Sequence, residues 1–325
     1  MLPVAVDAMG GDNAPQDIVA GARAANEKLG IAVTLFGDPD ALGDTGDLEV
    51  VATSEVIAMD AEPGSSVRRM KDASMVRAAE AVRDGAACAM VGAGNTGATM
   101  ASALLRMGRI KGVQRPAIVT PIPKPEGTPT CLLDAGANAE VTPEQLLQFG
   151  QMGAVYARDR FNVEQPRVGL LSIGEEAGKG TPLVKESYQL FADADWGDAT
   201  FVGNVEGRDL MGNEVDVVAT DGFTGNVALK TLEGGMRGLI TALLEAFADP
   251  AYADAAAQLA PALTPLYEKF QPDTYGGAML LGLKGVCIIS HGSSGPWAIE
   301  NAIRVGAELA QADVVGHLVE AVQQA

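Results

Sequence analysis

The chain has 325 residues, 47% of them apolar and 5% aromatic, enough for one large domain or two smaller ones. Its formal net charge of −19 excludes general nucleic-acid binding, which needs a positive surface field. The cysteines Cys88, Cys131 and Cys287 lie in apolar runs without metal-ligand spacing, and the first residues lack a secretory-signal pattern. We therefore expect a cytoplasmic protein with reduced cysteines and no bound metal.

Short apolar runs alternate with helical patterns along most of the chain. The predicted strands cover residues 3–6, 32–36, 87–91, 117–120, 131–133, 168–172, 199–202, 215–219 and 285–289. The predicted helices cover residues 15–29, 67–83, 142–156, 182–192, 223–247 and 297–309. This alternation is typical of βαβ units, so we expect an α/β fold with a doubly wound, mostly parallel sheet and helices on both faces.

Residues 249–275 depart from this alternation, because they are rich in alanine, contain four prolines and show no strand pattern. We predict a helical hairpin here, inserted into a single α/β catalytic domain that spans residues 1–325. The stretch LAPALTPLYEKF (259–270) is predicted at its tip, with Leu259, Leu263 and Leu266 forming an apolar surface. Such a surface contacts a membrane or an acyl chain, or packs on its own domain or a second subunit.

Five glycine-rich turns follow predicted strands, at residues 10–15, 92–97, 174–180, 221–226 and 290–295. Helix N-termini after strands attract anions, so these turns favour a phosphate-bearing ligand. Gly92, Gly94 and Gly97 spell G-x-G-x-x-G, but the window where an NAD site needs an acidic residue reads IKGVQRPAIV and is basic. An NADP-dependent dehydrogenase therefore remains one alternative.

The chain contains only two histidines and no G-x-S-x-G motif, which leaves few residues for nucleophilic catalysis. We interpret His317, in a terminal amphipathic helix, as structural. His291 lies in a turn directly after a predicted strand, and we expect it to be functional.

Basic residues cluster on this acidic chain. The clusters contain Arg68 and Arg69, then Arg106, Arg109 and Lys111. Such a cluster is either a solvated helix face or a docking surface for an acidic partner.

Six motifs together resemble a known family. They are VDAMGGDNAP (6–15), AGNTGA (93–98), LDAGAN (133–138), GLLSIGEEAGKG (169–180), DGFTGNVALKTLEG (221–234) and SHGSS (290–294). In this order they resemble phosphate acyltransferase, the PlsX family of bacterial phospholipid synthesis.

The resemblance implies acyl transfer from acyl carrier protein (ACP) to inorganic phosphate, without a cofactor. It also implies a homodimer with an isopropylmalate-dehydrogenase-like fold, which feeds a membrane glycerol-phosphate acyltransferase from a peripheral position at the inner face of the cell membrane. The alternatives are a phosphotransacetylase-like enzyme that uses acyl-CoA and a non-catalytic acyl- or ACP-binding scaffold.

Site residues follow from the chemistry that this reaction needs. Phosphate is already a nucleophile, so the protein has to capture it, align it with the carbonyl and stabilise an oxyanion. The expected catalytic residues are Lys185, Asn226 and His291. The expected phosphate- or substrate-binding residues are Gly10, Gly11, Asp12, Asn95, Thr96, Gly97, Asn138, Gly174, Lys179, Asp221 and Ser293. Arg68, Arg69, Arg106, Arg109 and Lys111 are the expected ACP-docking residues.

The chain departs from the family pattern at single positions within these motifs. Gly92 stands where relatives usually carry serine, so the G-x-G-x-x-G spacing is interpreted as a coincidence. Ile289 stands where lysine is frequent, which puts one phosphate or carrier contact in doubt.

Overall fold

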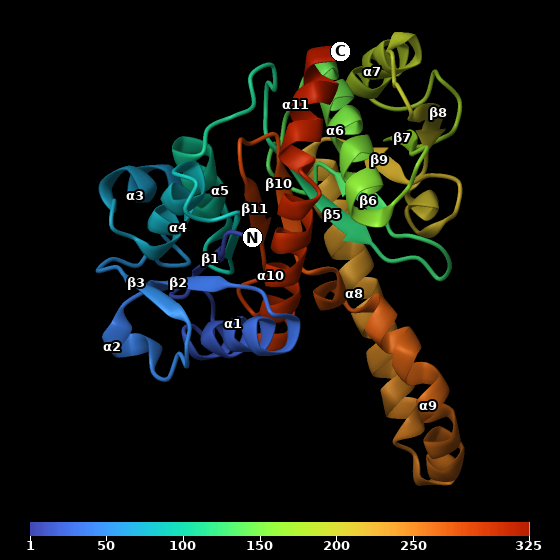
Figure 1. Ribbon diagram of the computed structural model, residues 1–325. Helices are drawn as coiled ribbons and strands as arrows, with labels where there is room; N and C mark the ends of the chain where they lie inside the picture. Colours follow the sequence, from blue (N-terminus) through green and yellow to red (C-terminus); the bar gives the residue numbers. More distant parts are fainter. Residues whose placement is uncertain (325) are drawn as a thin grey trace.

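The computed structural model describes residues 1–324, and Figure 1 shows the arrangement of its helices and strands. The strands are β1 (Val4–Asp7), β2 (Val33–Gly37), β3 (Glu49–Ala52), β4 (Ala89–Gly92), β5 (Ala117–Ile122), β6 (Thr130–Leu133), β7 (Arg167–Leu171), β8 (Thr200–Val205), β9 (Val217–Ala219), β10 (Ala278–Leu281) and β11 (Val286–Ile289). The α-helices are α1 (Gln16–Leu29), α2 (Pro39–Leu42), α3 (Pro63–Arg69), α4 (Ser74–Arg83), α5 (Thr96–Arg106), α6 (Pro143–Phe161), α7 (Pro182–Asp193), α8 (Gly222–Phe247), α9 (Ala253–Phe270), α10 (Pro296–Gln311) and α11 (Val314–Gln324). Three 3-10 helices are described, η1 (Gly207–Met211), η2 (Pro250–Tyr252) and η3 (Pro272–Tyr275).

Over the described range the strands form one eleven-stranded sheet in the order β3-β2-β1-β4-β11-β10-β5-β6-β9-β7-β8. Strands β3, β2, β1, β4 and β11 are mutually parallel and form the first half-sheet. Strands β6, β9, β7 and β8 are also mutually parallel and form the second half-sheet. Antiparallel pairings of β10 with β11, β10 with β5 and β5 with β6 join the halves, so the second half-sheet runs opposite to the first. The predicted mostly parallel α/β sheet is confirmed.

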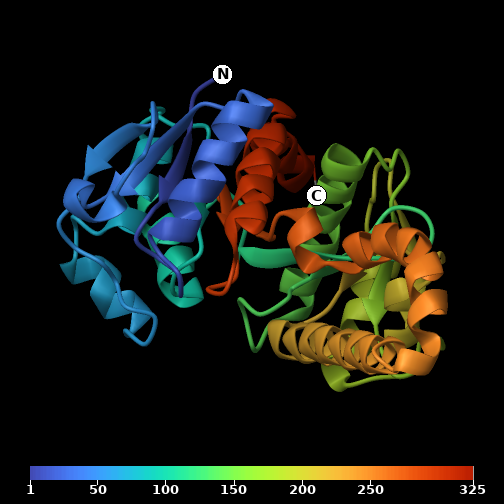
Figure 2. The same cartoon turned by 90° about the horizontal axis from the view of Figure 1, so that it is seen from below.

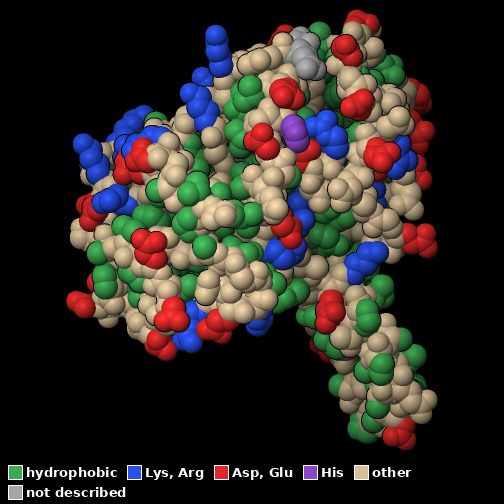
Figure 3. Space-filling view, in the orientation of Figure 1, with side chains coloured by type: hydrophobic (Ala, Val, Ile, Leu, Met, Phe, Trp, Pro, Cys, Tyr) green, Lys and Arg blue, Asp and Glu red, His purple; other side chains and the backbone are tan. Residues whose placement is uncertain are grey.

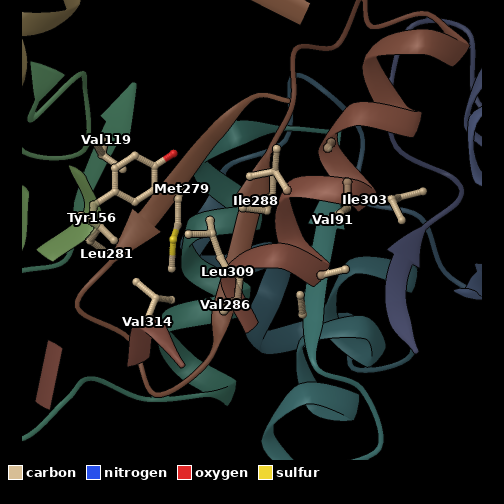
Figure 4. Packing of buried hydrophobic residues seen from close by; sticks show 14 of the residues in the cluster. Val91, Val119, Tyr156, Met279, Leu281, Val286, Ile288, Ile303, Leu309 and Val314 are labelled. Carbon is tan, nitrogen blue, oxygen red and sulfur yellow. The ribbon is translucent and has the colours of Figure 1, made fainter. Parts of the chain in front are cut away.

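Helices cover both faces of the sheet, and successive strand residues point into two different cores. In β4, Ala89 and Val91 belong to one core and Met90 to the other. Helices α1, α6, α10 and α11 pack on the first face, and α4, α5 and α8 on the second. Figure 4 shows residues of the first core, from the middle strands of the sheet and from the helices α6, α10 and α11 that pack on them. Figure 2 shows the first half (blue) and the second (green to yellow) on either side of the C-terminal helices (red).

Two strands and one helix break were not predicted. Strand β3 is a half-buried edge strand, and β10 is only four residues long between glycines, so neither gives a clear apolar pattern. The predicted helix over residues 67–83 is divided into α3 and α4. Asp72 lies in this break, where its carboxylate accepts hydrogen bonds from the Ser54 N–H (2.9 Å) and Oγ–H (2.7 Å). A contact with a distant segment therefore interrupts a pattern that is locally helical.

The helical hairpin protrudes from the body of the molecule, and its first arm is α8 itself (Figure 1). The chain turns at residues 248–252, because Asp249 accepts a hydrogen bond from the Ala251 N–H (2.8 Å) and Pro250 begins η2. The prediction that LAPALTPLYEKF forms the tip is therefore wrong, since this stretch lies in the returning arm α9. Pro261 and Pro265 are accommodated inside that helix.

Much of the hairpin surface is apolar (Figure 3). Leu239 is 72% exposed and Leu259 and Leu266 are each 49% exposed, while Leu263 is half-buried. No helix among residues 1–324 combines the length and hydropathy needed to cross a membrane.

Candidate active site

Three turns meet at the carboxyl ends of β1, β4 and β11, and we call them the first turn cluster. They cover residues 10–15, 92–97 and 290–295. The Asp12 N–H donates to the Gly292 carbonyl (2.7 Å), and the Ser290 N–H donates to the Gly92 carbonyl (2.9 Å). A Cβ atom at Gly10 would lie 2.8 Å from the Gly94 Cα, so the close approach of these two turns requires glycine. The cluster brings the predicted residues Gly10, Gly11, Asp12 and Gly97 into one region with Ser293.

Asn95 is the N-cap of α5 in the first turn cluster. Its Oδ1 accepts a hydrogen bond from the Ala98 N–H (3.0 Å). Its Nδ2 donates to the carbonyls of Ala58 (3.3 Å), Met59 (2.9 Å) and Ala61 (3.0 Å). The amide is therefore engaged within the protein, whereas the neighbouring Thr96 is exposed at the first turn of α5.

Two turns meet at the carboxyl ends of β6 and β9, at residues 134–138 and 221–226, and we call them the second turn cluster. The Gly222 N–H donates to the Asn138 carbonyl (2.7 Å), and a Cβ atom at Gly225 would lie 1.9 Å from the Asp134 carbonyl oxygen. Asp221 caps α8 by accepting from the Thr224 N–H (2.8 Å). The predicted residues Asn138, Asp221 and Asn226 are thus brought together.

The fully buried Asp134 carboxylate holds the second turn cluster. It accepts hydrogen bonds from the backbone N–H groups of Ile118, Gly136, Ala137 and Asn138 at 2.7–3.1 Å, and from the Asn138 side chain at 2.9 Å. Burial raises the pKa of this carboxyl group, and the hydrogen bonds oppose that rise. Asp134 lies in the LDAGAN motif but is not among the predicted site residues, because its role depends on backbone groups that only the fold brings together.

Asn138 and Asn226 differ in what their side-chain amides contact. Asn138 Nδ2 donates to the Pro116 carbonyl (2.8 Å) and to Asp134, so both of its amide hydrogens are used. Asn226 is exposed on the first turns of α8 beside Gly136, and its amide makes no hydrogen bond to the described residues. Of these two amides, only that of Asn226 is available to a ligand.

The turn at residues 174–180 follows β7, on the same sheet edge as the second turn cluster. Asn204 of β8 anchors it by donating its side-chain N–H to the Glu176 carbonyl (2.8 Å). Lys179 packs against Gly174, and Lys185 lies exposed on the first turns of α7. Both ammonium groups are free of ion pairs within the described residues.

His291 connects the two halves of the molecule. It lies in the first turn cluster, its side chain is 53% exposed, and its Nε2 is 3.9 Å from Oε1 of Glu233 on α8. An open recess of about 460 Å³ at the base of the hairpin is lined by Tyr267, Glu268, Gln271, Asp273 and Trp297. Burial raises the pKa of the Asp273 carboxyl group, and a protonated His291 opposes that rise. Glu233 is not among the predicted site residues, although it is the last charged residue of DGFTGNVALKTLEG.

The basic side chains gather over α3, α4 and α5 (Figure 3). Arg68 and Arg69 are exposed at the end of α3, whose Pro63 packs against Gly97 of the first turn cluster. Arg109 and Lys111 are exposed after α5. Arg106 differs, because it donates to the Val67 carbonyl (3.3 Å) and lies 3.6 Å from Glu80.

Solved structures with a similar fold are phosphotransacylases and a dehydrogenase. A branched-chain phosphotransacylase from Enterococcus faecalis V583 is 17% identical, with a TM-score of 0.62 over 95% of this chain and 99% of that one. A putative 4-hydroxythreonine-4-phosphate dehydrogenase from Salmonella typhimurium is 11% identical, with a TM-score of 0.55 over 95% and 99%. At these identities the similarity shows the fold alone.

Sequence relatives identify the family. A family model described as "Fatty acid synthesis protein" matches residues 2–317. A phosphate acyltransferase from Desulforudis audaxviator is 47% identical over 97% of this chain and 94% of its own length. One from Geobacillus sp. (strain WCH70) is 44% identical over 99% of both chains. With its acyltransferase motifs on a phosphotransacylase-like fold, the chain belongs to the phosphate acyltransferase family of fatty acid and phospholipid synthesis.

Proposed function

We propose that the protein transfers a long-chain acyl group from acyl-ACP to inorganic phosphate, by direct attack and without a covalent enzyme intermediate. A phosphate oxygen attacks the thioester carbonyl carbon, the C–S bond breaks, and acyl phosphate forms. His291 gives a proton to the departing pantetheine thiolate. The resulting acyl phosphate is an activated acyl donor for phosphatidic acid synthesis.

Direct attack by phosphate is supported mainly by one observation, that none of the described residues is an activated nucleophile. Neither histidine is hydrogen-bonded to a hydroxyl or thiol there, because His291 faces Glu233 and His317 pairs with Asp159 (2.8 Å). Burial raises the pKa of all three cysteine thiols. Covalent catalysis needs a nucleophile beside a base or with a lowered pKa, so phosphate itself is the best candidate.

The test is phosphate-dependent loss of the acyl group from palmitoyl-ACP, with hydroxylamine trapping of the product. Acyl hydroxamate formed only with enzyme, phosphate and palmitoyl-ACP supports the proposal. Turnover of palmitoyl-CoA alone would instead favour a phosphotransacetylase-like donor. Folded protein without turnover on either donor would favour an acyl- or ACP-binding scaffold.

Asn226 and Asn138 are expected to respond differently to alanine substitution. We propose that Asn226 donates to the phosphate or the oxyanion, with Lys185 neutralising charge nearby. Asn226→Ala should lower kcat by about 100-fold, as loss of one oxyanion donor does, with an unchanged melting temperature. Asn138→Ala should lower the melting temperature, because it removes two partly buried hydrogen bonds of the second turn cluster. Steady-state kinetics and thermal unfolding of the two variants check both expectations. Thr231→Ala, at an exposed position on α8, is the control.

Lys185 is expected to act mainly on phosphate binding. Lys185→Ala removes an exposed positive charge on α7 and should raise the KM for phosphate about tenfold, since the other basic groups remain. Gln189→Ala, one turn further along the same helix, is the matched control. An unchanged KM for phosphate would remove Lys185 from the site.

We propose that acyl-ACP docks on the exposed arginines of α3 and the residues that follow α5. Arg68→Glu combined with Arg69→Glu should raise the KM for palmitoyl-ACP about tenfold and flatten its salt dependence, because complementary charge steers association. The KM for phosphate should stay constant. Arg208→Glu combined with Arg237→Glu, at exposed positions outside this surface, controls for the same change in net charge. Equal KM values for both charge-reversal variants would contradict docking at this surface.

We propose that the exposed apolar hairpin mediates homodimerisation or peripheral membrane contact. Leu259→Glu places a charge on its apolar surface and should lower the fraction of protein that floats with anionic liposomes several-fold, since burying the charge is costly. Leu29→Glu on the body is the control, because Leu29 is similarly exposed. Light scattering of both variants separates the two roles. If Leu259→Glu floats with liposomes as the wild type does but dissociates to monomers, the hairpin belongs to the dimer interface.

A further inference from the structure

We propose that Glu233 is the positioning residue for His291, and this inference rests on the proposed role of His291 toward the leaving thiolate. The two residues are far apart in sequence, in DGFTGNVALKTLEG and SHGSS, and belong to different halves of the molecule. The fold nevertheless brings Nε2 of His291 to 3.9 Å from Oε1 of Glu233. A carboxylate that orients an imidazole is the usual third member of a catalytic chain, and Glu233 lies within ion-pair distance of a protonated His291.

Glu233 is itself held in place. Its Oε2 accepts a hydrogen bond from the Lys230 ammonium group at 2.8 Å, one turn earlier on α8. Its side chain is 19% exposed, compared with 53% for His291. The carboxylate therefore presents a fixed acceptor, while the histidine that it faces remains open to a ligand.

This arrangement determines which ring nitrogen is free. The Glu233 carboxylate lies 3.9 Å from Nε2, at ion-pair rather than hydrogen-bond distance, so we infer that Nδ1 is the nitrogen that remains for the substrate. Other charged groups around the ring are Asp273 on η3 and, through Glu233, Lys230. Asp273 is fixed through its backbone, since its carbonyl accepts from the Asn301 side chain at 3.1 Å. The contact that fixes the imidazole geometrically is therefore the one with Glu233, at 3.9 Å.

A double-mutant cycle tests whether Glu233 acts through His291. Glu233→Ala should lower kcat roughly tenfold, as loss of an orienting partner does, and leave the KM values for phosphate and acyl-ACP within about twofold. In the His291→Ala background the same change should have no further effect, because the group that it positions is absent. Glu233→Asp should recover part of the activity, and Glu245→Ala, exposed further along α8, is the matched control.

If the loss of activity in the double variant equals the product of the losses in the two single variants, the inference is overturned, because Glu233 would then act independently of His291. Full activity of Glu233→Ala would overturn it as well. Full activity of His291→Ala would remove the proposed role of His291 and the inference with it, while leaving acyl transfer itself intact.

Ring ¹⁵N chemical shifts give a readout that does not depend on turnover. The chain has two histidines, so the spectrum contains two ring systems, and His317, paired with Asp159, is the internal reference. We expect wild-type His291 to be the Nε2–H tautomer when neutral and Glu233→Gln to change its ring signals without moving those of His317. Identical His291 signals in both proteins would overturn the pairing, even if acyl transfer were confirmed.

Discussion

The antiparallel strands β10 and β5 are the constraint on which the rest of the molecule depends. They join two parallel half-sheets that run in opposite directions. The carboxyl ends of the strands in one half therefore point the opposite way from those in the other half. The two turn clusters therefore cannot form one continuous row. Helix α8 bridges them, because it begins in the second cluster and reaches His291 of the first about three turns later, at Glu233.

The strands and turns that could be predicted from the sequence are those whose structure is determined by a local residue pattern. Buried strands such as β1 and β4 are continuous apolar runs because helices cover both faces, and each is followed by a glycine-rich turn. The failures arise from long-range effects. Strand β10 is a strand because β5 and β11 flank it, and the break between α3 and α4 contains Asp72, which binds Ser54. The hairpin turns at Asp249 and Pro250, where Asp249 caps the short helix η2 just after α8 ends. Pro261 and Pro265, in contrast, remain inside α9.

Within the site, residue type alone could not separate ligand-binding from structural amides. Asn95 and Asn226 occupy similar places after strands, but Asn95 donates to carbonyls of residues 58–61, which are distant in sequence. Asn226 has no such partner among the described residues. Glu233 illustrates the opposite case, because its relation to His291 exists only in three dimensions. A motif thus identifies the turn, and the packing around it decides which side chains remain available.

The sheet topology also bears on how the chain folds during synthesis. Val91 of β4 pairs with Ile288 of β11, and a side chain at Gly21 of α1 would collide with Ile299 of α10. The first half-sheet is therefore completed by residues translated about 200 positions after β4. Contacts of such long sequence separation form slowly, and an incomplete chain exposes apolar strand edges. His291 joins the first turn cluster only when that segment has been made, so a partly synthesised chain lacks one of the three turns of this cluster.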